Sequence, residues 1–260
     1  MDTPQVPPAA PDAGQKMSWS DKFVGIFSSP GEVFDAIRRS PVANSNWVIP
    51  TVVLALVGAI LGFVVISNPS IYDQIQRVAS EQMEKSFQKA IADGRMTQEQ
   101  ADQARGQAES FGATGIRISA VAAPLFVPFF SLFAWSLVYW LLGKGVMKAT
   151  SPYLKVAEVY GLTNFIALLG GIITTIMMIG MDSFSATPSA SLFVGEFSAT
   201  NSWHRLAAAF NVFTIWQLAV VGIGLARIFE REAAKVLVLV FALWLLWNCA
   251  LIFGLGSFSG

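Results

Sequence analysis

The chain has 260 residues, of which 54% are hydrophobic and 13% are charged, and its formal net charge at pH 7 is zero. Soluble domains carry about 25% charged residues, so this composition excludes an ordinary soluble globular protein. A neutral chain has no overall basic field, and no nucleic-acid partner is expected. With one cysteine and one histidine, we expect no disulfide within the chain, no metal site and no cofactor.

The first part of the chain is expected to lie outside the membrane. Residues 1–17 contain four prolines and predict a disordered tail, because their composition buries too little apolar area to offset chain entropy. Residues 18–46 predict two short amphipathic helices. The second opens with Ser29-Pro-Gly-Glu32, a pattern that predicts a capping box in which Ser29 accepts from the Glu32 amide. Their apolar faces fit helices that lie in the membrane interface or that pack under the bundle.

Five apolar runs are each long enough to cross about 30 Å of hydrocarbon at roughly 1.5 Å per residue. They cover residues 47–66, 118–142, 159–181, 207–226 and 236–254. The predicted fold class is an all-α membrane protein with a bundle of five transmembrane helices, and residues 47–260 form its membrane domain. Pro124 and Pro128 are expected to kink the second span. Gly58 and Gly62 predict close helix packing within the chain first, and a homo-oligomer contact second.

Residues 68–117 form the one sizeable segment outside the membrane and predict a helical hairpin. Charges of both signs alternate at helical spacing. Asp93-Gly94 separates the two arms, and Thr97-x-x-Gln100 is a capping-box pattern at the start of the second. The carboxylates here have no adjacent nucleophile, histidine or metal-ligand spacing. With no catalytic constellation in the spans either, we predict that the chain has no catalytic residues and is not an enzyme.

Basic residues in the short turns predict the orientation. Five spans place the N-terminus, the turn after residue 142 and the turn at 227–235 on one side. These segments carry 4, 3 and 3 Lys and Arg residues, against 6, 1 and 0 on the other side, where the six are spread through the long hairpin. Since short turns decide orientation, we expect a cytoplasmic N-terminus and an extracytoplasmic hairpin and C-terminus, in the cell (inner) membrane.

Two groups of polar residues are candidates for function. The first, at the predicted cytoplasmic turns, would contact lipid or a protein partner: Lys144, Lys148, Tyr153, Lys155, Glu158, Arg227, Arg231 and Lys235. Aromatic and basic residues also collect at span ends as anchors, which is the simpler interpretation of Tyr153, Lys155 and Glu158. The second group lies within the spans and would line the path of a transporter: Asn164, Asn211, Gln217 and Asn248.

Three segments resemble the bacterial proteins that contain a Yip1 domain. They are Phe27-Ser-Ser-Pro-Gly-Glu-Val-Phe-Asp-Ala-Ile37 with Pro41 and residues 47–50, then Gly143-Lys-Gly145 with Tyr153-Leu-Lys-Val-Ala-Glu-Val-Tyr-Gly161, and finally Arg231-Glu-Ala-Ala-Lys235. The resemblance implies a five-helix, multi-pass membrane protein with a cytoplasmic N-terminus. Eukaryotic relatives bind prenylated Rab GTPases and help to organise vesicle membranes, but Rab binding is not carried over to this chain.

The function predicted from these observations is a non-enzymatic membrane organiser or adaptor. It would bind lipid or a protein partner at the cytoplasmic face. The alternative is a transporter or channel for a small or lipid-like solute. A polar cavity at mid-membrane depth would favour transport, whereas a sealed bundle with an exposed basic and aromatic face would favour the adaptor.

Overall fold

A computed structural model describes residues 17–195 and 197–254. Within these residues the elements are helices, and extended pairing is limited to an isolated bridge between Ser189 and Asn211. The prediction of an all-α fold is confirmed. Apart from Met17, the tail predicted to be disordered lies outside the described residues.

Among the described residues, five helical segments are long and apolar enough to cross a membrane, which confirms the predicted number of spans. They are α3 (Ser45–Ser67), the part Gly112–Gly145 of α5 (Gln98–Gly145), α6 (Tyr153–Gly180), α8 (Val212–Phe229), and α9 (Ala233–Cys249) with the π-helical turn η2 (Ala250–Gly254). The fourth begins at Val212 and not at residue 207, because the chain at 207–209 belongs to a short separate helix. Large apolar side chains remain on the outside of these helices: Phe126 is 71% exposed and Phe130 is 76% exposed. An exposed apolar surface of this size is unfavourable in water and favourable in contact with the hydrocarbon of a membrane.

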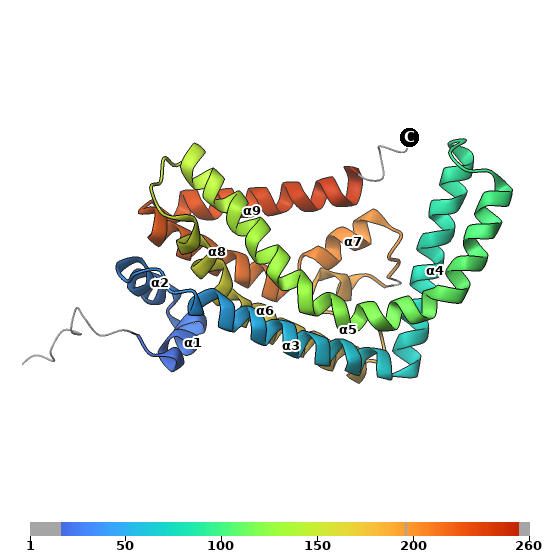
Figure 1. Ribbon diagram of the computed structural model, residues 1–260, viewed down its shortest axis with the longest axis horizontal. Coiled ribbons are helices and arrows are strands. Elements are labelled where there is room, and N and C mark those ends of the chain that lie inside the picture. Colours follow the sequence, from blue (N-terminus) through green and yellow to red (C-terminus); the bar gives the residue numbers. More distant parts are fainter. Residues whose placement is uncertain (1–16, 196, 255–260) are drawn as a thin grey trace, which may run out of the picture.

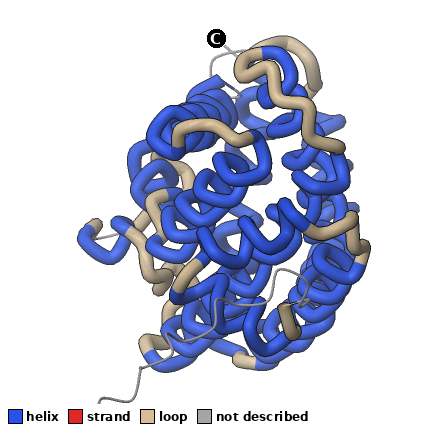
Figure 2. Tube along the Cα trace, turned by 90° about the vertical axis from the view of Figure 1, so that its left-hand side faces the viewer, coloured by secondary structure: helices blue, strands red, loops and turns tan. Residues whose placement is uncertain are grey.

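The five long helices alternate in direction between two ends of the molecule (Figure 1). Helix α3 packs against α5 and α6, α6 packs against α8, and α8 packs against α9. One end, at the left of Figure 1, carries α1 (Trp19–Ser28), α2 (Pro30–Arg39) and the turns that join α5 to α6 and α8 to α9. We call it the basic end, and Figure 2 views the molecule from this side.

The opposite end carries the hairpin of α4 (Pro69–Ala92) and the start of α5, together with the short helices η1 (Ala190–Phe193) and α7 (Ser202–Ala209). Gly94, with φ of +66°, turns the chain between the arms. The Thr97 side chain accepts from the Gln100 amide and the Gln100 side chain accepts from the Thr97 amide, so this capping box is confirmed. The second arm and the second predicted span, separate in the sequence pattern, form one continuous helix of 48 residues.

Close approach of α3 and α5 depends on two glycines. A Cβ added at Gly62 would lie 2.0 Å from the carbonyl oxygen of Ala120, and one at Gly58 would lie 3.1 Å from Cβ of Pro124. At Gly62, only a residue without a side chain lets the two backbones come this near, whereas a methyl group at Gly58 would require a shift of a few tenths of an ångström. The prediction that this glycine pair packs helices within the chain is confirmed.

Helices α1 and α2 pack under the basic end. Val33, Phe34 and Ile37 of α2 are buried, and the Phe34 ring fills the space that a side chain at Gly224 of α8 would take. Ser29 is the N-cap residue of α2, but its side chain makes no capping hydrogen bond, so the predicted capping box is wrong. The packing interpretation of these helices therefore has direct structural support, while their contact with a lipid surface stays a prediction.

Candidate functional site

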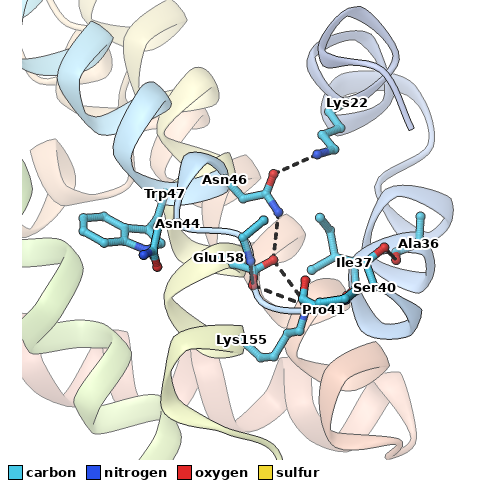
Figure 3. Close-up of polar contacts among 11 residues, drawn as sticks. Lys22, Ala36, Ile37, Ser40, Pro41, Asn44, Asn46, Trp47, Lys155 and Glu158 are labelled. Atoms are coloured by element: carbon cyan, nitrogen blue, oxygen red, sulfur yellow. Dashed lines mark hydrogen bonds and ion pairs between the residues drawn. The ribbon is translucent and has the colours of Figure 1, made fainter. Parts of the chain in front are cut away.

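The most distinctive polar feature of the basic end is an ion pair inside the protein (Figure 3). Lys155 and Glu158 lie in the first two turns of α6, and their spacing of three residues places both side chains on one helix face. Glu158 is 0% exposed and Lys155 is 7% exposed. Lys155 Nζ lies 3.3 Å from Glu158 Oε1. Lys155 and Glu158, which were predicted to contact lipid or a partner at the surface, therefore lie inside the protein.

Both charges have further hydrogen-bond partners. The Glu158 carboxylate accepts from the Ala43 amide at 3.0 Å and from Asn46 Nδ2 at 2.8 Å. Lys155 Nζ donates to the carbonyl oxygens of Ile37 at 2.7 Å and Pro41 at 3.2 Å. A buried ion pair is tolerated when such bonds replace the lost water. The pair therefore joins the start of α6 to the α2–α3 connection.

Helix α1 is tied to the same group of residues. Lys22 Nζ donates to Asn46 Oδ1 at 2.8 Å (Figure 3). Burial lowers the pKa of Lys22, and the nearby Lys155 ammonium lowers it further, while the Glu158 carboxylate opposes both. We call Lys22, Asn46, Lys155 and Glu158 the polar cluster. It brings α1, the α2–α3 connection, α3 and α6 together at one point.

Sequence reasoning did not single out Lys22 or Asn46 as members of this site. The available signal was weak: Asn46 directly precedes the predicted first span, and Lys22 is one of several basic residues in an amphipathic helix. Their role follows from contacts between residues distant in sequence.

A partly open pocket of about 330 Å³ lies beside Lys155. At its edge, Arg38 Nη1 forms an ion pair with Glu230, and Arg38 Nε lies 3.8 Å from Asp35. The pocket is lined by Arg38, Ser40, Pro41, Val42, Ser151, Pro152, Lys155 and Ile228. It lies between the C-terminal end of α2, the start of α6 and the last turn of α8.

The remaining basic candidates lie on the surface of the basic end. The exposed set is Lys144, Lys148, Arg227, Arg231 and Lys235. Arg231 joins the two turns, because its Nε donates to the Met147 carbonyl oxygen at 2.9 Å and its Nη2 to that of Lys148 at 3.5 Å. Lys144 Nζ lies 4.2 Å from the centre of the Trp140 ring. The structure thus brings these five side chains to one end of the molecule.

Tyr153 is partly buried, unlike the five basic side chains. Its hydroxyl donates to the carbonyl oxygen of Phe133 at 3.2 Å, and its ring lies edge-on to that of Trp140. These contacts connect α6 with α5 and fit the anchoring interpretation.

The four polar residues of the predicted transport path do not all lie together, although two of them do. Asn164 donates to Thr51 at 2.9 Å in the contact between α6 and α3, and Asn248 donates to the carbonyl oxygen of Trp244 in its own helix. Asn211 and Gln217 do line a common pocket of about 210 Å³ between α6 and α8. The structure therefore supports a local polar pocket formed by two of the four residues.

Among the described residues, no group of three histidine, cysteine or carboxylate side chains is placed to hold a metal ion. In the part of the chain that the structure describes, five long apolar helices with exposed apolar surfaces define a multi-pass helical membrane protein. A family model described as Yip1 domain matches residues 24–255, and the chain belongs to this family. The predicted resemblance to the Yip1-domain family is confirmed. No curated protein and no solved structure gives a significant match to the chain.

Proposed function

We propose that this protein is a non-enzymatic membrane organiser or adaptor that engages its partner at the basic end. The observation that carries the proposal is the pair of basic turns joined by Arg231, which gathers five exposed cationic side chains at one end of the molecule. Two of the five have acidic neighbours, Arg227 with Asp35 and Lys235 with Glu232. Cations gathered at the end of a helical bundle favour acidic protein surfaces and anionic lipid headgroups. The polar cluster supports this face by fixing α1 and α2 beneath it.

We further propose that the basic end faces the cytoplasm and that the protein resides in the inner membrane. The short basic turns support this orientation through the positive-inside rule. It is tested by single cysteines at Lys148 and Arg95, in a background where Cys249 is replaced by serine. A membrane-impermeant maleimide should label Arg95→Cys on intact cells or spheroplasts and Lys148→Cys only after lysis. The opposite pattern would overturn the orientation.

The adaptor role is tested by in-cell crosslinking from a photoreactive residue at Lys148. We expect a specific protein adduct that is lost when Lys144 and Lys235, two exposed cations of the basic turns, are changed to glutamine. A matched control changes Arg77 and Lys85 of the hairpin to glutamine, which removes the same charge at the other end. Lipid adducts or self adducts alone would argue against a protein partner, and self adducts would indicate a homo-oligomer.

The transporter alternative is favoured by one observation, the pocket that Asn211 and Gln217 line. Transport requires this pocket to be reached by water from both sides of the membrane in turn. A cysteine at Gln217 that reacts with a small impermeant thiol reagent from both sides would support transport. Reaction from one side alone would show that the pocket opens to that side only, and would argue against transport.

A further inference from the structure

We propose that the pocket beside Lys155 binds the phosphate group of an anionic membrane phospholipid. We call it the Arg38 pocket, after the cation at its mouth. Cationic side chains line it from two elements, Arg38 from α2 and Lys155 from α6. Its volume of about 330 Å³ is at the lower end of the range for small-ligand sites, which suits a headgroup better than a whole lipid.

Arg38 is placed to exchange partners. Its guanidinium is planar with five N–H donors, of which Nη1 binds Glu230 while Nε faces Asp35 at 3.8 Å. Within the part of the chain that the structure describes, the Nη2 edge has no acceptor assigned to it and remains for a phosphate oxygen. Bonds between a guanidinium and a phosphate are charge-assisted and often bidentate.

Glu230 holds the position that an anion would take. Its side chain is 67% exposed and follows the end of α8, at a residue with φ of 54°. A carboxylate so accessible loses little when it turns out to water. Binding of a phosphate would therefore replace one anion on Arg38 by another, and Glu230 acts as a weak competitor.

The inner wall of the pocket also favours an anion. Pro152 is the N-cap residue of α6, and no side chain caps the first turn of that helix. The Lys155 amide donates to the Pro152 carbonyl oxygen at 3.1 Å, and the positive end of the helix dipole lies at this wall of the pocket. Glu158 and the two carbonyl oxygens take the three N–H groups of the Lys155 ammonium and neutralise its charge, so Lys155 shapes the pocket wall and Arg38 is the cation that binds the phosphate.

The location indicates a lipid as the source of the phosphate. The pocket lies where α6 begins and α8 ends, which is the depth of lipid headgroups in a bundle of this kind. Pro41, Val42 and Ile228 add apolar surface to its wall, and Val42 is 40% exposed. A headgroup with an attached glycerol backbone matches both surfaces, whereas free phosphate uses only the polar one.

The inference rests on the proposed function in placing the basic end at a membrane surface, and it names the lipid class that this end binds. The two proposals fail separately. The crosslinking experiment at Lys148 probes the exposed turns and does not involve Arg38, whereas lipid binding at the Arg38 pocket requires no protein partner.

The test uses the full-length protein in a nonionic detergent, titrated with dioctanoyl phosphatidylglycerol and followed by native mass spectrometry. We expect Arg38→Gln to weaken binding about tenfold, the effect of losing one charge-assisted hydrogen bond. Arg39→Gln removes the same charge from the neighbouring residue, which does not line the pocket, and should leave binding unchanged. Glu230→Gln should tighten binding about two- to fivefold, because it removes the competing carboxylate.

The two variants are expected to change affinity in opposite directions. A variant that disturbs folding would lower affinity, so tighter binding by Glu230→Gln cannot come from misfolding. Equal weakening by Arg38→Gln and Arg39→Gln would overturn the proposal in favour of unspecific charge attraction. Equal binding of dioctanoyl phosphatidylcholine would overturn the preference for an anionic lipid. Displacement of the lipid by an equal concentration of inorganic phosphate would overturn the lipid source, and failure of phosphate to compete supports it.

Discussion

Replacing Glu158 by glutamine should destabilise the protein strongly, although the change keeps the size of the side chain. Glu158 is fully buried and accepts hydrogen bonds from Ala43 and Asn46 while it faces Lys155. Glutamine brings an NH₂ group toward one of these donors and leaves the Lys155 ammonium without its counter-ion. Breaking a buried ion pair in this way costs about 3–5 kcal/mol. Because Lys155 keeps two carbonyl acceptors, we expect a loss near the lower limit, about 3 kcal/mol.

The assay is reversible unfolding in mixed micelles of nonionic detergent and dodecyl sulfate, followed by tryptophan fluorescence. Limited proteolysis between α1 and α2 provides a second measurement, since release of the polar cluster should free α1 before the bundle unfolds. The control is Glu81→Gln, the same chemical change at an exposed position of α4, which should alter stability by less than about 0.5 kcal/mol.

A double-mutant cycle tests the origin of the effect. Lys155→Met should also be destabilising, but the double variant should lose less than the sum of the two single losses, by roughly 0.5–3 kcal/mol, because the partner charge is gone. If Glu158→Gln behaved like the exposed control, or if the two losses were simply additive, the assignment of a stabilising buried ion pair would be refuted.

Two further results are expected from the same structure. Gly62→Ala should lower the free energy of unfolding by about 1–3 kcal/mol, because its Cβ would meet the Ala120 carbonyl oxygen at 2.0 Å. Gly171→Ala, whose Cβ finds ordinary contact at 3.6 Å, should cost much less, and equal losses would contradict the packing argument. In the hairpin, hydrogen bonds from Arg105 lower the pKa of Glu84 below its ordinary value of 4.5. The interaction between Glu84 and Arg105 therefore contributes its full stabilisation at pH values above 4.5, and this stabilisation is lost as the pH falls through the lowered pKa of Glu84. Carboxyl-carbon NMR should show that titration, Arg105→Gln should raise the pKa back toward 4.5, and an unchanged pKa in that variant would exclude Arg105 as the cause.

Features with local causes could be predicted well from the sequence. The spans follow from the length of apolar runs, and the capping box at Thr97 follows from hydrogen bonds within four residues. The failure at Ser29 shows the limit of such reasoning. Its backbone adopts φ of −144° and ψ of 60° between two packed helices, and its hydroxyl makes no bond to the first turn of α2. Packing of α1 against α2 decided the geometry of that junction.

The continuous helix α5 shows a second limit. The sequence pattern separates an arm that ends near residue 110 from a span that begins at residue 118, because polarity changes between them. A change in polarity alters the surroundings of a helix but does not break its backbone hydrogen bonds. In the structure, α5 passes through this change without interruption.

By itself, the sequence determined the class of this protein, because burial in hydrocarbon requires long uncharged helices and their number and order can be counted along the chain. It also placed the basic residues near span ends. Only the tertiary structure decided which of them are surface groups. Lys155 and Glu158 bind residues 112 to 118 positions away, and the face of α6 that turns inward is determined mainly by packing with α3 and α8. A pattern of neighbours along the chain does not contain those contacts, so the polar cluster and the Arg38 pocket became visible only in the folded molecule.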